Sequence, residues 1–491
     1  MRSFLTKALA LQALLLPHVV IGASPDQGPL TAILDGEPSH ESIWPHLPRY
    51  YTLPSLQEQA AIQDAWTEER RARIPKILQN YGVDAWLISQ REYAEDTVFW
   101  SIKSARQFAA RRRTTFLFLA NASHGTPDSY RWIDNTPKLW QDLKGVLAQQ
   151  DLKSIAVNTH ADIAFSSGLR LGEYEALVAG IGKKWAARLV SKPIIGVDYV
   201  ASMPESRAIW YRRLQSTAWA MISEAFSERV IVPGETTTTD VEWWMREKIQ
   251  QMNYTTWFHP AVTIITGRDF IPANLSSMTT ETSPSLDISK DDKNVINFGD
   301  LLHVDFGVTA LGLNTDTQHL AYVLYPGQTE DDIPRGFIEG LKKGNRLQDI
   351  VKSNMKIGRT GNEILKASLD QMRSEGIEGT VYSHPIGDWG HSAGPVIGMT
   401  NLQDGVPVLG DLPLLPNMYY SVELLVEHFV PERNATLQFP LEEDIRHVPG
   451  SSEGDDDSVW LWAYARQERF HVVRTPLAAA ERKNGLGGGY L

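Results

Sequence analysis

The chain is 491 residues long and carries 47 lysines and arginines against 59 aspartates and glutamates, a formal net charge of −12. Hydrophobic residues make up 42% and charged residues 22%, ordinary globular usage that excludes collagen-like, coiled-coil and wholly disordered chains. Nucleic-acid partners are not expected of so acidic a chain. The absence of cysteine excludes disulfides and thiolate chemistry, which leaves carboxylates and imidazoles as ligands for any metal.

The N-terminus has the order of a signal peptide. Arg2 and Lys7 precede an apolar run over residues 8–21, and small residues follow it. The alternative is an N-terminal anchor, but the run is shorter than the roughly 20 residues of a membrane span, and Pro17 interrupts it. We therefore predict a signal peptide over residues 1–23, secretion and no membrane span. Glycosylation is suggested by four Asn-X-Ser/Thr sites, at Asn121, Asn253, Asn274 and Asn434.

The first half of the chain predicts an α/β domain. Residues 24–50 are rich in proline, glycine and serine and indicate an irregular leader. A helix is expected next, and short apolar runs then alternate with helical segments. The expected elements are a helix over 56–80, strands over 85–89, 115–120 and 154–157, and a helix over 171–190. We place this domain at residues 51–200.

The second half, residues 201–491, predicts an α+β domain with an internal repeat. Ser202 and Glu205 are spaced as a capping box before a long amphipathic helix, and Thr239 with Glu242 is spaced to cap another. The same order, a helix followed by a capped helix, is repeated with a helix over 334–355 and a cap at Thr360. Two copies of helix, turn, capped helix and strands suit a pseudo-two-fold domain.

Two aspartates in this half are spaced to converge. Asp305 alternates with the apolar residues of a half-buried strand, which places it on the opposite face, and Asp316 follows eleven residues later. The intervening segment is short enough for a hairpin, so both carboxylates could meet on adjacent strands. Two solvated strand carboxylates would be the alternative.

Four further polar residues favour a metal centre. His384, His391, Glu423 and Glu442 each lie in an apolar or glycine-rich context. A carboxylate among buried apolar groups is costly unless a cation or hydrogen bonds compensate it. Four carboxylates and one imidazole suit two divalent ions.

In order and spacing these residues resemble the pita-bread metallopeptidase family, which includes methionine aminopeptidase, prolidase, aminopeptidase P and creatinase. The family pattern is an aspartate in a strand ending Asp-Phe-Gly, a second aspartate eleven residues on, a histidine, another histidine seven beyond it, and two later glutamates. The matching residues are Asp305, Asp316, His384, His391, Glu423 and Glu442. The resemblance covers roughly residues 200–450 and implies a creatinase-type N-terminal domain followed by a pita-bread catalytic domain.

The resemblance also implies roles. Asp305 and Asp316 would hold one metal, with Asp316 as the bridge, and His384 would bind the other. Glu423 and Glu442 would complete the ligand set, and Glu423 would also shuttle a proton from water to the leaving nitrogen. His391 would hydrogen-bond the substrate carbonyl. The metal's identity is not set by sequence: manganese is favoured, and zinc, cobalt or iron would fit an oxygen-rich site.

The final ligand has a register ambiguity. Glu442 and Glu443 are adjacent and would point to opposite faces of a strand. The family pattern of an apolar residue, the ligand, an acid, any residue and an apolar residue matches residues 441–445 only with Glu442 as the ligand.

The sequence also departs from the family around the pocket. A histidine that usually precedes the first aspartate is replaced by Asn274, and His259 could substitute for it or be an ordinary loop histidine. An arginine that tends to lie two residues before the last ligand is replaced by Pro440, and Leu424 stands where a proline often follows the first glutamate. The metal ligands themselves are unaffected.

The sequence thus predicts a metal-dependent hydrolase, a peptidase acting at Xaa-Pro bonds in the manner of prolidase or aminopeptidase P. One rival is an enzyme on the same metal platform that cleaves another C–N bond in a small amide. A second rival, a non-catalytic binding module, predicts eroded ligands, whereas all five are present. The expected partner is a peptide or small amide substrate; homodimers are common in the resembling family, and sequence leaves the oligomeric state open.

Overall fold

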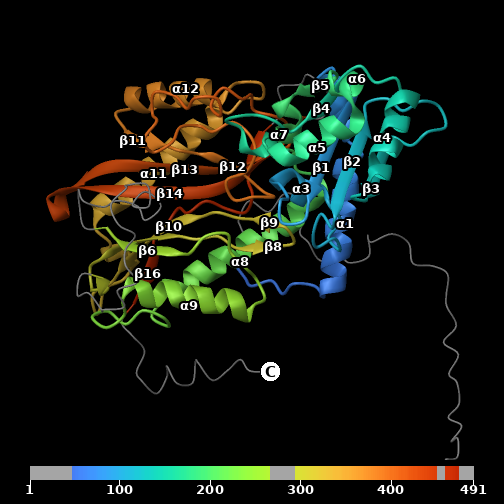
Figure 1. The fold of residues 1–491 in the computed structure, drawn as a ribbon. Helices are drawn as coiled ribbons and strands as arrows, with labels where there is room; N and C mark the ends of the chain where they lie inside the picture. Colours follow the sequence, from blue (N-terminus) through green and yellow to red (C-terminus); the bar gives the residue numbers. More distant parts are fainter. Residues whose placement is uncertain (1–46, 266–293, 451–458, 475–491) are drawn as a thin grey trace, which may run out of the picture. The chain divides into compact units, whose positions relative to one another are not determined.

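Two β-sheets, built from separate stretches of the chain, organise the protein (Figure 1). The structure is a computed structural model that describes residues 47–265, 294–450 and 459–474. These residues belong to one compact unit that begins at Leu47. The predicted signal peptide, the leader up to residue 46 and Asn274 lie outside the described residues.

The first sheet has five strands in the order β3-β2-β1-β4-β5. β1 pairs in parallel with β4 and antiparallel with β2, so the sheet is mixed. Its elements are α1 (Leu56–Arg71), α2 (Ile74–Asn80), β1 (Ala85–Arg91), α3 (Thr97–Ile102), β2 (Arg113–Leu119), β3 (Ser129–Ile133), α4 (Pro137–Gln149), β4 (Ile155–Val157), η2 (Ala164–Ser166), α5 (Leu171–Ile181), α6 (Lys183–Ala186), β5 (Leu189–Ser191) and α7 (Pro193–Ala201). The expected division at residue 200 falls at the end of α7.

The second sheet has nine strands, with the main order β11-β13-β14-β10-β7-β6. Three further strands join it: β12 pairs with β13, β15 with β14 and β16 with β10. The elements of this part of the chain are η3 (Glu205–Arg207), α8 (Ala208–Ala225), α9 (Thr238–Gln251), β6 (Ala261–Ile264), β7 (Leu301–Asp305), β10 (Gln318–Val323), η5 (Glu330–Asp332), α11 (Arg335–Asn354), α12 (Gly361–Ser374), β11 (Glu378–Val381), β12 (His384–Ile386), β13 (Tyr419–Val430), η6 (Pro431–Arg433), β14 (Ala435–Val448), β15 (Val459–Trp462) and β16 (His471–Val473). Between β7 and β10, β8 (Thr309–Ala310) and β9 (Leu313–Asn314) form a separate two-stranded sheet.

Helices cover both faces of this second sheet. Alternate residues of one strand enter different cores: Leu301 packs with residues of α11 and α12, whereas Leu302 and Val304 pack with residues of α8 and α9. Figure 1 shows the two helix pairs on either side of the strands. This is the period-two alternation of a sheet buried on both sides. A polar side chain between the sheet and its helices is therefore buried on either face.

Local structure departs from the sequence expectations in two helices of the first half of the chain. The helix expected over 56–80 is two helices, since Pro75 lies in the first turn of α2, where a missing N–H costs nothing. The helix expected over 171–190 stops at Ile181, because Gly182 has a φ of +79°, which ends the helix.

The expected caps before α8 and α9 are also wrong. The Ser202 hydroxyl donates to Pro416 O rather than capping a helix, and η3 intervenes before α8. Thr237 rather than Thr239 caps α9, in a reciprocal pair with Asp240, because a run of threonines offers several equivalent starts. The Thr360 cap of α12 is confirmed, with Glu363 as its partner.

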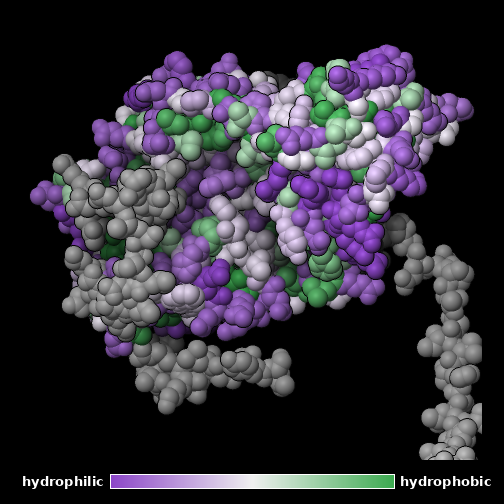
Figure 2. Space-filling view, in the orientation of Figure 1, coloured by the Kyte–Doolittle hydropathy of each residue, from purple (hydrophilic) through white to green (hydrophobic). Residues whose placement is uncertain are grey.

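In the described part of the chain no helix combines the length and apolar character needed to cross a membrane. On the face drawn in Figure 2, apolar side chains lie in small groups among hydrophilic ones.

Candidate metal centre

Three carboxylates and one amide lie in a row across four neighbouring strands. Gln318 of β10 is opposite Asp305 of β7 on one side and opposite Glu442 of β14 on the other. Glu442 is in turn opposite Glu423 of β13. Directly opposed residues of antiparallel strands point to the same face, so this register gathers the carboxylates at one place in the sheet.

His384 and Asp316 complete the cluster from two other segments. His384 Nε2 lies 3.3 Å from Glu442 Oε1, 3.7 Å from Asp316 Oδ2 and 3.9 Å from Glu423 Oε2. Ligand atoms of Asp316, His384 and Glu442 all lie within 4.8 Å of one another, a spacing that could hold a metal ion. The structure thus brings together the five side chains singled out as ligands: Asp305, Asp316, His384, Glu423 and Glu442.

Two buried atoms of this cluster lack a hydrogen-bond partner: Asp305 Oδ1 and His384 Nε2. Buried polar atoms are rarely left without one. The His384 Nδ1–H donates to Pro385 O at 3.0 Å, which leaves a lone pair on Nε2 facing the carboxylates. Such an arrangement is typical of a metal-ligating histidine. The residues present therefore fit a divalent cation.

The electrostatics of the cluster favour the same conclusion. Burial, followed by the charge of Glu442, raises the pKa of both Asp305 and Asp316 well above the ordinary value. Burial raises the pKa of Glu442 to about 7 and lowers the pKa of His384 to about 4, so this imidazole is neutral at pH 7. Close buried carboxylates cannot all ionise without a compensating cation.

Sequence reasoning missed Gln318. Its Nε2 donates to Glu423 Oε1 at 2.6 Å and to Glu442 Oε2 at 2.7 Å. His303 lies behind it, with Nε2 2.8 Å from Gln318 Oε1. The available signal was the spacing of two residues from Asp316, which in an extended segment puts Gln318 on the same face.

Asp444 is a second supporting residue that the sequence did not reveal. Its Oδ2 accepts the backbone N–H of Asp316 at 3.1 Å and the hydroxyl of Tyr211 at 2.8 Å. Ser421 acts similarly on Glu442, donating to Oε1 at 2.5 Å. These contacts orient the ligands, as outer hydrogen bonds commonly do around metals.

Glu443 points away from the cluster. Its Oε1 lies 2.9 Å from His319 Nε2 and accepts the backbone N–H of Gln467 at 2.8 Å. Adjacent strand residues point to opposite faces, which places Glu442 rather than Glu443 among the ligand atoms.

His391 lies beside the cluster and outside the group of ligand atoms. Its ring is edge-on to His384 at 4.6 Å between centroids and contacts Trp257 at 5.0 Å. Proximity to His384, together with burial, lowers the pKa of His391 to about 3, so the ring is neutral and can donate one hydrogen bond.

Of the residues discussed as departures, His259 lies away from the cluster, whereas Leu424 and Pro440 belong to the strands that carry Glu423 and Glu442. His259 precedes β6, is half exposed, and contacts Trp243 and faces Glu242 of α9 rather than the cluster. Pro440 is a residue of β14 opposite Leu425.

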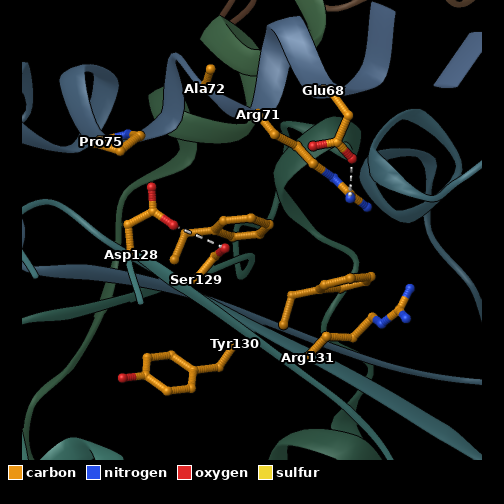
Figure 3. A pocket seen from close by; sticks show the side chains of 10 residues that line it. Glu68, Arg71, Ala72, Pro75, Asp128, Ser129, Tyr130 and Arg131 are labelled. Atoms are coloured by element: carbon orange, nitrogen blue, oxygen red, sulfur yellow. Dashed lines mark hydrogen bonds and ion pairs between the residues drawn. The ribbon is translucent and has the colours of Figure 1, made fainter. Parts of the chain in front are cut away.

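A pocket of about 380 Å³ opens beside the cluster and is lined by His384, His391 and Glu423. A second cavity, of about 310 Å³, lies between α1 and the strands β2 and β3 (Figure 3). Its lining includes Glu68, paired with Arg71, and Tyr130, but none of the candidate ligands. The chemistry therefore belongs to the first pocket.

The model of metallopeptidase family M24 matches residues 211–446, the segment that contains the whole cluster. No curated protein matches the chain in sequence. Among solved structures, the X-Pro aminopeptidase of Thermotoga maritima MSB8 is 15% identical, with a TM-score of 0.50 over 80% of this chain and 98% of that one. The dipeptidase PepE of Mycobacterium ulcerans is 14% identical, with a TM-score of 0.50 over 84% and 99% of the two chains. Zinc-substituted aminopeptidase P of E. coli is 11% identical, with a TM-score of 0.50 over 82% and 96%.

At these identities the solved structures establish the fold, and the family match covers the segment that carries the ligands. Residues 211–446 thus match the model of metallopeptidase family M24, and the chain has the pita-bread fold of the solved peptidases.

Proposed function

We propose that this protein is a dinuclear metallopeptidase that hydrolyses peptide bonds beside proline. The observation that carries the proposal is the row of Asp305, Glu442 and Glu423, closed by His384 with its unpartnered Nε2. The similarity in fold to an X-Pro aminopeptidase and to aminopeptidase P supports the proline preference. Four carboxylates and one imidazole suit two divalent ions, and we favour manganese because it prefers oxygen ligands.

Each ligand residue has a distinct part in this proposal. Asp305 and Asp316 would hold one ion, with Asp316 shared between both, and His384, Glu423 and Glu442 would complete the site. Divalent cations bound here would acidify a water and polarise the scissile carbonyl. The carboxylates supply the negative charge that keeps them in place.

Proton transfer falls to residues at the pocket side of the cluster. Glu423 lines the pocket, so its carboxylate can take a proton from the attacking water and pass it to the leaving nitrogen. His391 lines the same pocket as a neutral imidazole and can donate a hydrogen bond to the substrate carbonyl oxygen, where negative charge develops.

The experiment is hydrolysis of Xaa-Pro dipeptides, Xaa-Pro-Yaa peptides and matched peptides without proline, with added manganese and with a chelator. Cleavage beside proline that the chelator abolishes is the expected result, and the products distinguish an aminopeptidase from a dipeptidase. Cleavage of small amides alone would instead support the rival activity on the same metals. Two manganese ions per chain by elemental analysis, against one or none, tests the dinuclear site.

We also propose that the protein is secreted and glycosylated. The described acceptor residues Asn121, Asn253 and Asn434 are all exposed, which supports glycosylation at these sites. Expression of the full chain in a eukaryotic secretory host tests this: the protein should appear in the medium, begin at Ser24 and lose mass on treatment with an N-glycosidase. Retention of an intact N-terminus inside the cell would contradict it.

A further inference from the structure

One wall of the pocket beside the metal centre comes from the N-terminal part of the chain, which contains the five-stranded sheet. Ile163 and Phe165 lie at the turn η2, and Val197 belongs to α7. All three line the same pocket as His384 and Glu423, although they precede these residues by almost half the chain. The N-terminal part therefore contributes directly to the space in which a substrate would lie.

This wall is apolar, and so are other residues of the lining: Val396, Leu409 and Leu412. Phe165, Leu409 and Leu412 are only partly buried. A ligand that covered them would remove apolar surface from water, which is favourable in proportion to the area covered. Asp162 also lines the pocket and is exposed, so an acidic side chain would meet a like charge there.

The wall is held rigidly. The backbone N–H of Ile163 donates to His160 Nδ1 at 3.1 Å, and the Ser166 hydroxyl donates to Pro193 O. Gly196 of α7 packs so closely that a Cβ there would lie 2.9 Å from Phe165 O. The Phe165 ring also meets Trp389 edge-on at 6.5 Å, and Trp389 is two residues before His391. The wall and the catalytic side of the pocket are therefore fixed relative to each other.

We propose that this wall selects peptides with a large apolar side chain, aromatic or branched aliphatic, next to the scissile bond, and that Phe165 is a specificity-determining residue. The inference rests on the proposed peptidase function. The pocket volume of about 380 Å³ falls in the range of about 300–1,000 Å³ found for drug-sized ligands. It therefore has room for more than a proline ring.

The test is a series of Xaa-Pro peptides in which Xaa is Gly, Ala, Leu, Phe or Asp, hydrolysed by the wild type and by Phe165→Ala. The wild type should prefer Leu and Phe and disfavour Asp. In Phe165→Ala the ratio of kcat/KM for the Phe peptide to that for the Gly peptide should fall by about 10-fold or more. Phe108→Ala is the matched control, because Phe108 is 89% exposed and does not line the pocket. An unchanged ratio in Phe165→Ala, or a wild-type preference for Gly, would overturn the proposal.

A binding measurement separates this proposal from the proposed function. Calorimetry with phenylalanine amide and glycine amide, in the presence of manganese, reports on the pocket without turnover. If the wild type cleaves none of the peptides, tighter binding of the phenylalanine amide that is lost in Phe165→Ala still supports the pocket, and equal binding of both amides overturns it. Phe165→Leu guards against a folding defect in Phe165→Ala, since it should keep the apolar preference and shift it from aromatic toward aliphatic side chains.

Discussion

His303 Nε2 lies 2.8 Å from Gln318 Oε1, and this contact decides which way the Gln318 amide faces. Burial lowers the pKa of His303 to about 4, so the ring is neutral. Its Nδ1 lies 3.2 Å from the Thr263 hydroxyl, which can donate to it, while Nε2–H donates to the amide oxygen. The Gln318 NH2 group is thereby turned toward Glu423 and Glu442.

Gln318→Ala should weaken metal binding, because both carboxylates lose the donor that holds them in position. Loss of such an orienting contact typically reduces metal affinity or activity by about 10- to 100-fold. Manganese titration by calorimetry measures the change. Gln438→Ala, on the neighbouring strand β14 and away from the cluster, is the control and should bind metal as the wild type does. Equal affinity in the two variants would mean that Gln318 has no orienting role.

Asp316→Ala should abolish turnover while the protein still folds, since a shared ligand serves both proposed ions. In the absence of metal, the substitution removes one of several carboxylates that repel one another. The loss of the Asp316 charge should therefore not destabilise the apo protein. Metal at about 100 times its Kd should stabilise the wild type by about 2.7 kcal/mol and leave this variant unchanged. Thermal unfolding with and without manganese measures both effects, with exposed Asp331→Ala as the control. Wild-type turnover in Asp316→Ala would refute the assigned site.

Metal affinity should rise with pH through the range in which Glu442 titrates. Its pKa is raised from an ordinary 4.5 to about 7, so the folded apo protein holds this proton where the unfolded chain has already lost it. The stability that this proton contributes to the apo protein is therefore lost as pH rises from about 4.5 to about 7. Metal must displace the proton, and binding becomes easier over the same interval.

Calorimetry in buffers of different ionisation enthalpy should detect protons released on binding of manganese at pH 6, and fewer at pH 8. Glu442→Gln removes one of the titrating carboxyl groups and should reduce the number of protons released at pH 6. An affinity that is constant across these pH values would count against the raised pKa.

Asp388→Ala should destabilise the protein severely, because it leaves two buried guanidinium groups uncompensated. Asp388 Oδ2 lies 2.5 Å from Arg70 Nη1, and Oδ1 pairs with Arg207. Burial alone would raise the pKa of Asp388, but the two arginines outweigh it and hold the pKa below its ordinary value. Removing one partner of a buried pair costs about 3–5 kcal/mol.

Urea unfolding of the apo protein measures this cost, and exposed Asp404→Ala is the matched control. The pKa of Asp388 is lower in the folded protein than in the unfolded chain, so its ionised carboxylate stabilises the fold at pH values above the unfolded-state pKa. This contribution to the free energy of unfolding should disappear as pH falls through the acidic range. A loss of stability no larger than that of Asp404→Ala would show that the two arginines are compensated in another way.

Local patterns in the sequence were sufficient for the elements near the site. The alternation around Asp305 predicted a half-buried strand with the carboxylate on the face opposite its apolar neighbours. The strand is confirmed as β7, but it is buried along its whole length, because helices cover both faces of the sheet. The first residues of the helices were harder to predict from sequence. Thr237 and Thr239 are equally good candidates to cap α9, and only the folded structure shows that Thr237 is the cap. The break at Pro75 was visible in sequence, because proline in a first turn is a recognised helix start.

The sequence by itself determined which chemistry was available: without cysteine, the conspicuous polar groups of an apolar sheet had to be carboxylates and imidazoles, in a fixed order along the chain. Only the tertiary structure decided their neighbours. Strand register sets Gln318 between Asp305 and Glu442 and turns Glu443 to the other face, and register depends on pairing along the whole sheet. The contacts of Arg70 with Asp388 and of Phe165 with Trp389 join segments far apart in sequence, and long-range packing leaves no local pattern by which to read them.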